Sequence, residues 1–265
     1  MTTTATDAPF VTSRQDGPVL RLTLNRGDRF NPLSSAMIAG LQGELDRAAD
    51  NREARVVVLA AEGRGFSAGH DLKEMRAHSG DQAWQHHLFD DCSRMMMTLT
   101  RLPQPVIARV HGIATAAGCQ LVSMCDLAVA ADTATFALPG VNIGVFCSTP
   151  AVGVARNVGR KHAMELLLTG QPIDARTALA WGLVNRVVPL DELDREVEKF
   201  VALITARSGA TIALGKRTFY RQLDAGLETA YQVAGDAMTC NMDLADAGEG
   251  IDAFLGKRPP TWQGK

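Results

Sequence analysis

The sequence lacks several features that mark common protein classes. Its five cysteines are odd in number and form no C-x-x-C pair, which is typical of a reduced protein without a disulfide framework. No apolar run approaches about 18 residues, the length that predicts a membrane span. We therefore expect neither a disulfide-stapled domain nor a membrane segment.

An excess of charge of one sign is also missing. The chain has 27 Lys and Arg against 29 Asp and Glu, a formal net charge of −2, and no long basic run, so we expect no nucleic-acid partner. Neither G-x-x-x-x-G-K-[ST] nor G-x-G-x-x-G occurs, which argues against ATP and NAD. His86, His87 and His162 have no partners at metal-ligand spacing. We predict no metal and no bound cofactor.

The first ten residues, M-T-T-T-A-T-D-A-P-F, do not look like a targeting segment. They have no basic start and no apolar stretch, and they contain an Asp but no Arg. These features disfavour both a signal peptide and a transit peptide. From them we predict a cytoplasmic location.

Apolar patterns further along the chain predict an α/β domain. Residues 19–24 alternate and read as a strand, and residues 56–60 form a continuous apolar run typical of a strand covered on both faces. Between them, a helix is expected from an N-cap at Ser34. After residue 191 the pattern is almost wholly helical. We expect a tail over 1–17, a core over 18–200 and a helical region over 201–265 in the same domain.

The stretch from Pro103 to Phe136 organises the rest. A buried strand over 106–110 is broken by Gly112, and the small residues 115–118 then open a helical apolar segment. The first amides of a helix have no partner inside it and lie at the positive end of its dipole. We place such a donor at Ala117, with close helix packing as the alternative explanation for the small residues.

A second loop, G-R-G-F-S-A-G-H-D-L-K-E-M at 63–75, follows another predicted strand. Gly69 is able to take a positive φ, and Ser67 and Ala68 add little bulk, so the amide of His70 is free to face a ligand. Two backbone donors aimed at one point form an oxyanion hole.

These motifs resemble the crotonase superfamily of enoyl-CoA hydratases and isomerases. The resemblance rests on F-S-A-G-H-D-L-K-E-M, P-V-I-A-R-V-H-G-I-A-T-A-A-G-C-Q-L and L-L-T-G-Q-P-I-D-A-R-T-A-L-A-W-G-L-V-N-R-V-V-P, and it runs from about Val19 to Arg258. A-T-A-A-G-C-Q-L and F-C-S-T-P look most like the branch of enoyl-CoA hydratase domain-containing protein 3. The resemblance implies a spiral core of repeated ββα units and a helical C-terminal region that forms a homotrimer or a dimer of trimers. It also implies an acyl-CoA thioester, with coenzyme A as part of the substrate, whose enolate is held by the amides of His70 and Ala117.

The sequence departs from the hydratase pattern at two positions. Gln120 and Gly140 stand where the hydratases carry glutamates, and neither side chain can take a proton from water. Losing a general acid or base typically costs about 100- to 10,000-fold each. We therefore expect no efficient hydration of a simple enoyl-CoA. A non-catalytic acyl-CoA-binding or regulatory protein of the same fold is the alternative.

Three further side chains are candidates near the chemistry. Ser148 matches a position where some relatives carry an Asp, and it is suited to hold a water or a substrate carbonyl. Cys147 beside it is either a nucleophile or a packed, inert thiol. The imidazole of His70 is either catalytic, paired with Asp71, or part of the wall of the pantetheine channel.

Coenzyme A also brings phosphates that require cations. Arg26, Arg29 and Lys73 are candidates, with surface solvation as the alternative for each. Phe254 and Lys257 resemble the family's C-terminal contacts to the coenzyme A of a neighbouring subunit. The remaining predicted substrate contacts are Ala68, Asp71, Leu72, Ile113 and Gly140.

Overall fold

The structure is a computed structural model that describes residues 8–265. Residues 1–7 of the predicted tail lie outside the described residues. The strands are β1 (Val11–Asp16), β2 (Val19–Leu24), β3 (Val56–Ala61), β4 (Gly65–Ser67), β5 (Val106–Val110), β6 (Ile113–Thr115), β7 (Leu127–Ala131), β8 (Thr135–Ala137), β9 (Ile173–Asp174) and β10 (Arg186–Val188). The helices are α1 (Ser35–Asp50), α2 (Leu72–Ala77), α3 (Gln82–Arg101), α4 (Ala117–Met124), α5 (Ser148–Val154), α6 (Arg160–Thr169), α7 (Ala175–Trp181), α8 (Leu193–Thr205), α9 (Gly209–Leu223), α10 (Leu227–Met242) and α11 (Ala245–Leu255). Short 3₁₀ turns lie at Gly27–Arg29, Pro139–Ile143 and Leu190–Glu192.

Two sheets form the core. The larger has the order β1-β2-β3-β5-β7-β10 and is parallel except for the antiparallel pair β1 and β2. The smaller has the order β4-β6-β8-β9, with only β8 and β9 antiparallel. In the larger sheet Val57 is level with Val106, and Ile107 is level with Leu127. This register brings the ends of β3, β5 and β7 to one edge.

The chain winds through both sheets in a repeated order. A strand of the large sheet is followed at once by one of the small sheet, as β3–β4, β5–β6 and β7–β8, and each pair then leads into a helical segment. Parallel neighbours require such crossovers. The ββα spiral that the family resemblance implied is therefore confirmed.

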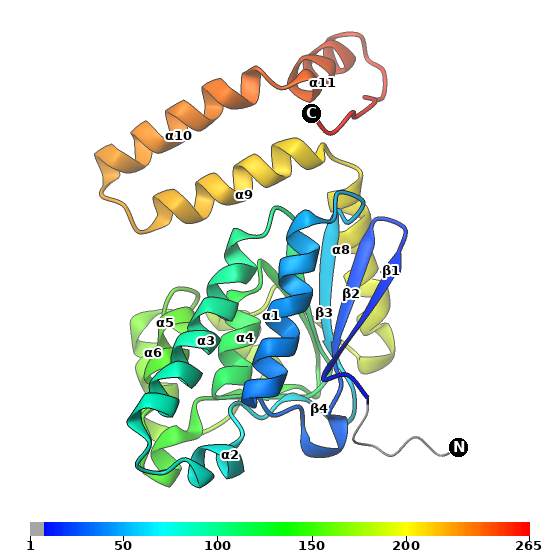
Figure 1. Cartoon of the computed structure of the whole chain (residues 1–265). Helices are drawn as coiled ribbons and strands as arrows, with labels where there is room; N and C mark the ends of the chain where they lie inside the picture. Colours follow the sequence, from blue (N-terminus) through cyan, green and yellow to red (C-terminus); the bar gives the residue numbers. More distant parts are fainter. Residues whose placement is uncertain (1–7) are drawn as a thin grey trace.

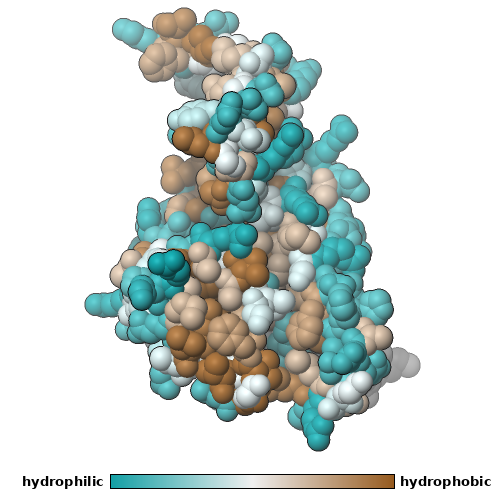
Figure 2. Space-filling view, turned by 90° about the vertical axis from the view of Figure 1, so that its left-hand side faces the viewer, coloured by the Kyte–Doolittle hydropathy of each residue, from teal (hydrophilic) through white to brown (hydrophobic). Residues whose placement is uncertain are grey.

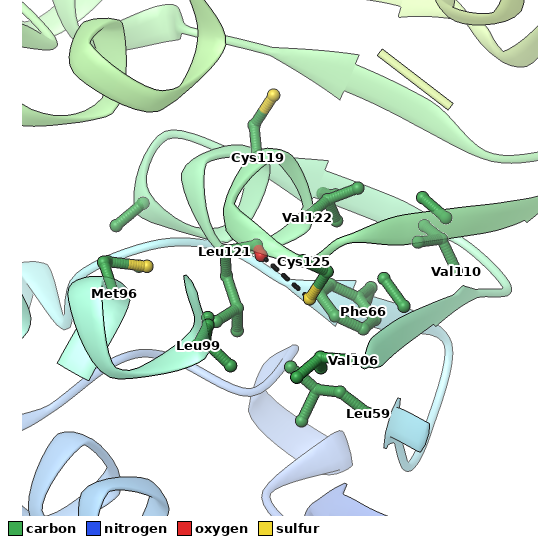
Figure 3. Close-up of a cluster of buried hydrophobic side chains, with 14 of the residues drawn as sticks. Leu59, Phe66, Met96, Leu99, Val106, Val110, Cys119, Leu121, Val122 and Cys125 are labelled. Atoms are coloured by element: carbon green, nitrogen blue, oxygen red, sulfur yellow. Dashed lines mark hydrogen bonds between the residues drawn. The ribbon is translucent and has the colours of Figure 1, made fainter. Parts of the chain in front are cut away.

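The inner face of the large sheet packs against α1, α3 and α4 (Figure 1). Figure 3 shows Leu121 of α4 and Cys125, the residue just after α4, pointing toward Leu59 and Val106 of the sheet, whereas Cys119 points away from them. The Cys125 thiol donates to the carbonyl oxygen of Leu121 at 3.3 Å, so this polar group is satisfied inside the core.

Helix α8 covers the other face of the large sheet. Leu193, Val197 and Val201 recur on one side of α8 and pack on a layer that includes Val56 and Ile107. Strand β3 is thus covered on both faces, which explains its unbroken apolar run.

One sequence prediction needs correction at the start of the chain. Residues 11–16, expected in the tail, form β1 and pair with β2 from Val11 opposite Leu24 to Asp16 opposite Val19. Only Val11 of this strand is buried. A strand at the edge with one buried residue carries almost no apolar signal, which is why the sequence pattern missed it.

Helices α9 to α11 extend away from the sheets and form an arm, residues 209–255, at the top of Figure 1. The N-cap prediction at Ser34 is confirmed, because the Ser34 hydroxyl accepts from the amide of Met37. Asp81 caps α3 through the amide of Trp84. No helix in the described part of the chain is long and apolar enough to cross a membrane.

Candidate functional site

A cavity of about 560 Å³ opens where the ends of β4, β6 and β8 meet α2, α3 and α5. Its wall is mainly apolar and contains no Asp, Glu, Lys or Arg among the described residues. Figure 2 shows apolar surface gathered on the face that carries α5 and α6. Ile143, Val145 and Phe146, in the segment before α5, are exposed apolar residues. The lining residues are Ala68, His70, Leu72, Met75, Phe89, Thr115, Ala116, Ala117, Pro139, Gly140, Asn142, Ile143, Val145, Phe146, Cys147, Ser148, Thr149 and Pro150.

The turn before α4 holds an unusual backbone. Ala116 has φ 50° and ψ −121°, a conformation that glycine takes far more readily than alanine. The amide of Ala116 donates to the carbonyl of Ala137 at 2.9 Å. The first hydrogen bond of α4 runs from the Gln120 N–H to the carbonyl of Ala116 at 3.0 Å. Within residues 8–265 the amide of Ala117 has no acceptor, as expected for the first residue of a helix.

The loop at 67–70 is held against this turn. The carbonyl of Gly69 accepts from Leu33 N–H at 2.8 Å, and the Ser67 hydroxyl donates to the carbonyl of Asn31 at 2.9 Å. Gly69 has φ 83°, and a Cβ added there would lie 2.8 Å from the Ala116 Cβ and 3.1 Å from the Ala117 nitrogen. The two bends are therefore in contact. The amide of the next residue, His70, likewise has no acceptor among the described residues.

The side chain of His70 is partly buried at the wall of the cavity. Burial lowers its pKa to about 4, so the ring is neutral at pH 7. Its Nε2 is sealed from solvent with no hydrogen-bond partner in the described chain, and the ring meets Phe89 edge to face, with centroids 5.5 Å apart. The proposed pairing with Asp71 is absent: that carboxylate instead caps α2 through the amides of Lys73 and Glu74.

Gln120 and Gly140 have different surroundings. Gln120 is 4% exposed, lies one turn into α4 outside the cavity lining, and its Oε1 has no partner among residues 8–265. Gly140 does line the cavity, but a Cβ there would lie 2.3 Å from the Val145 carbonyl oxygen and 2.9 Å from the Cys147 Sγ. The loop at 145–147 thus fills the space that a side chain at position 140 would need.

Cys147 and Ser148 both line the cavity. Burial raises the pKa of the Cys147 thiol, the opposite of what activates a nucleophile, and this supports the inert-thiol alternative. Ser148 is the first residue of α5 and is exposed, with a long 3.5 Å contact from its hydroxyl to the Phe146 carbonyl. Its hydroxyl is available to a molecule in the cavity.

The predicted cations lie outside the cavity. Arg26 donates to the carbonyls of Ala8, Pro9 and Asn25 and stacks on the ring of Phe10 at 3.8 Å, so it holds the N-terminal segment. Arg29 is exposed and lies 3.6 Å from the Asp28 carboxylate. Lys73 is exposed on α2, and Lys257 follows α11 with φ 52°. Phe254 is 82% exposed on α11.

The remaining predicted contacts divide in the same way. Ala68 and Leu72 line the cavity, whereas Ile113 is 41% exposed at the start of β6 and does not. Sequence reasoning missed Phe89, which reaches the wall from the middle of α3, and the apolar loop at 143–146. Phe89 is 19 residues away from the loop that carries His70, so no local motif links them.

No group of three or more His, Cys, Asp or Glu side chains suited to a metal lies within residues 8–265. The five cysteines, all in this range, are free.

Known proteins resemble this chain in sequence and in fold. The enoyl-CoA hydratase/isomerase family pattern matches residues 14–265. The chain is 47% identical over 253 residues to enoyl-CoA hydratase domain-containing protein 3, mitochondrial, of Rattus norvegicus, covering 95% of this chain and 83% of that protein. Among solved structures, an enoyl-CoA hydratase of Mycobacterium smegmatis superposes with a TM-score of 0.94 at 52% identity, covering 96% of this chain and 99% of that one. Human enoyl-CoA hydratase domain-containing protein 3 superposes with a TM-score of 0.92 at 46% identity, covering 96% and 100%.

One prediction is contradicted by these relatives. We expected a cytoplasmic location, but the rat, mouse, human and frog relatives are named mitochondrial. A compartment is set by a targeting signal and not by the packing of the folded domain, so the domain's own residues did not decide it.

The motifs, the fold and the overall sequence of the chain all indicate the same family. The family pattern spans nearly the whole described chain, the branch resemblance carried by A-T-A-A-G-C-Q-L and F-C-S-T-P is confirmed by the relatives, and the ββα spiral matches their structures. The chain belongs to the enoyl-CoA hydratase/isomerase family.

Proposed function

We propose that the protein binds an acyl-CoA thioester in the cavity and stabilises its enolate with the amides of His70 and Ala117. The observation that carries this proposal is that two contacting bends each contribute an amide with no acceptor among the described residues, beside an apolar cavity. A preorganised donor of this kind is worth about 3 to 4 kcal/mol toward a developing oxyanion. The N-terminus of α4 adds its dipole at the same point.

The proton-transfer groups of a hydratase are not present in the cavity wall. No carboxylate from residues 8–265 lines it, and Gln120 and Gly140 offer no base. The low pKa of His70 makes its ring a weak base at neutral pH. Efficient hydration is therefore not the proposed reaction. Isomerisation, thioester hydrolysis and decarboxylation remain as candidate reactions. Decarboxylation fits these residues best, because loss of CO₂ forms the enolate directly and no general base has to remove a proton.

Binding without turnover is the second candidate, favoured by the same absence of a carboxylate. The two are separated by incubating the purified protein with crotonyl-CoA, a malonyl-type thioester and saturated acyl-CoAs, while following enoyl absorbance, CO₂ and free thiol. Turnover of a thioester other than crotonyl-CoA supports the enzyme. Binding with no turnover supports the second candidate, and hydration at tens per second would overturn the argument from the missing glutamates.

We further propose that the arm at 209–255 packs against copies of the same chain. Helix α10 has no buried residue, and four exposed apolar side chains recur along one stripe of it. The stripe consists of Leu227, Tyr231, Met238 and Met242. A homotrimer or a dimer of trimers would cover it, and would bring Phe254 and Lys257 near a neighbouring subunit's coenzyme A.

We also propose coenzyme A contacts at Arg26, Arg29 and Lys73, and the structure supports these three residues to different degrees. Lys73 lies close to the cavity, because it directly follows the lining residue Leu72. It forms no ion pair with any of residues 8–265. Arg26 already holds the N-terminal segment, so it supports the proposal least.

A further inference from the structure

The wall of the cavity contains one polar ring among apolar side chains. His70 lies with Leu72, Met75 and Phe89 on the side formed by α2 and α3. A polar group placed among apolar neighbours costs free energy unless it is hydrogen-bonded, because it loses its contacts with water. The position of this ring therefore requires an explanation.

The hydrogen-bonding capacity of the ring is unused within the described chain. A neutral imidazole carries one donor and one acceptor. Nε2 is sealed from solvent without a partner, and no hydrogen bond joins Nδ1 to any of residues 8–265. Since Nε2 is closed off, Nδ1 is the ring nitrogen left to meet a molecule in the cavity.

Apolar groups dominate the rest of the wall. Its other side chains that carry a nitrogen or oxygen come from elements separate from the loop of His70, and they are Thr115, Asn142, Ser148 and Thr149. Binding cavities commonly combine apolar walls with a few polar groups that fix orientation. A wholly hydrocarbon acyl chain would fill this cavity but leave the ring unpaired.

We infer that the His70 ring is a specificity-determining group that hydrogen-bonds an oxygen substituent, a hydroxyl or carbonyl, on the acyl chain of the thioester. This inference rests on the proposed function, because it places the acyl group in the same cavity. The substrate class is then an oxygenated acyl-CoA with an otherwise apolar chain. A site that bonds a substrate oxygen discriminates strongly against the analogue lacking it, because its own buried polar group is then left unpaired.

The test is calorimetric binding of octanoyl-CoA and of a set of hydroxy- and oxo-octanoyl-CoAs with the oxygen at successive carbons. Wild-type protein is expected to bind one member of the set at least about tenfold tighter than octanoyl-CoA. In His70→Leu this ratio is expected to fall to about twofold or less. In His86→Leu, a replacement of an exposed histidine of α3 outside the cavity, the wild-type ratio should remain.

The outcomes separate the inference from the proposed function. Equal binding of octanoyl-CoA and every oxygenated analogue by wild-type protein would overturn the inference and leave the proposed function standing. Binding of none of them would overturn both. A preference that survives in His70→Leu would also overturn the inference, since another group would then be responsible.

Discussion

At the scale of single residues, the site depends on positions where little or no side chain is present. Gly69 allows the loop at 67–70 to touch the turn before α4, and Ala116 adopts a backbone conformation that few alanines take. Gly140 leaves room for the loop at 145–147 to lie against it, where a Cβ would meet the Val145 carbonyl oxygen. Close approach of backbone segments therefore shapes the cavity at these positions.

We predict that Gly69→Ala removes activity toward thioesters. The added methyl would lie 2.8 Å from the Ala116 Cβ and 3.1 Å from the Ala117 nitrogen, at a φ of 83°, so the bends must move apart. Loss of one aligned donor lowers kcat by about 100- to 1,000-fold. Gly80→Ala is the matched control, because Gly80 has φ 86° and nothing within 4 Å of the added Cβ. Full turnover by Gly69→Ala would disprove the role of the contact.

The buried ring of His70 predicts a loss of stability in acid. Its pKa is about 4 in the folded chain and about 6.5 when unfolded, so the unfolded state binds the proton first. Stability is therefore full above about pH 6.5 and is lost as the pH falls toward 4, by about 3 kcal/mol. Denaturant melts at pH 7 and pH 4.5 measure the loss, which should shrink in His70→Leu but persist in His86→Gln. An unchanged acid loss in His70→Leu would contradict this account.

At the scale of elements, one buried cluster fastens the arm to the sheets. The Lys216 ammonium of α9 donates to the carbonyls of Leu99 and Gln104, at 2.8 and 2.9 Å, and to the Asp126 carboxylate at 2.6 Å. Asp126 also accepts from the Tyr220 hydroxyl at 2.9 Å. Burial lowers the pKa of Lys216 and opposes its charge, whereas Asp126 supports it. These contacts fix α9 at the ends of α3 and β5.

We predict that Lys216→Met destabilises the protein by about 3 to 5 kcal/mol, because it leaves a buried carboxylate without its partner. The double variant Lys216→Met with Asp126→Asn should recover part of this loss. Lys199→Met is the control, since Lys199 is exposed in its pair with Glu196. Unfolding in urea measures all three, and equal stabilities for the two lysine variants would show that the cluster does not fasten the arm.

At the scale of the whole molecule, the arm carries large apolar side chains that no other part of the described chain covers. Leu227 is 75% exposed and Tyr231 is 74% exposed, although both lie on a regular helix. Patches of this kind on a soluble protein are commonly interfaces. The arm is fastened to the core through α9, whereas α10 packs mainly on α9, so its exposed stripe is available to other copies.

We predict that the double variant Leu227→Glu with Tyr231→Glu lowers the mass in solution. Two charges placed in the proposed interface would have to be buried unpaired, so association should weaken by at least tenfold. Light scattering after size exclusion measures the mass of wild type and variant. Leu203→Glu, on α8 outside the arm and 59% exposed in the described chain, is the control. A monomeric wild type would contradict the proposal.

The candidate site was predictable from the sequence where the signal is local. Gly69 and the small residues before α4 predicted two bends. The order of strands predicted parallel neighbours, which place both bends at one edge of the sheet. Gln120 was placed in the site by resemblance alone, and in the structure it lies outside the cavity lining. The ββα repeat could not be seen as a fixed period in the sequence, because its helices differ in length: α4 has 8 residues and α3 has 20.

The sequence by itself determined strands β2, β3 and β5, the cap of α1 and the family, because each follows from residue type and spacing. Tertiary structure alone decided that residues 145–147 fill the space beside Gly140, that Phe89 meets His70, and that Lys216 reaches Asp126 from 90 residues away. The physical reason is that these contacts join segments whose approach depends on how the helices pack on the sheets. Local pattern carries no information about that packing.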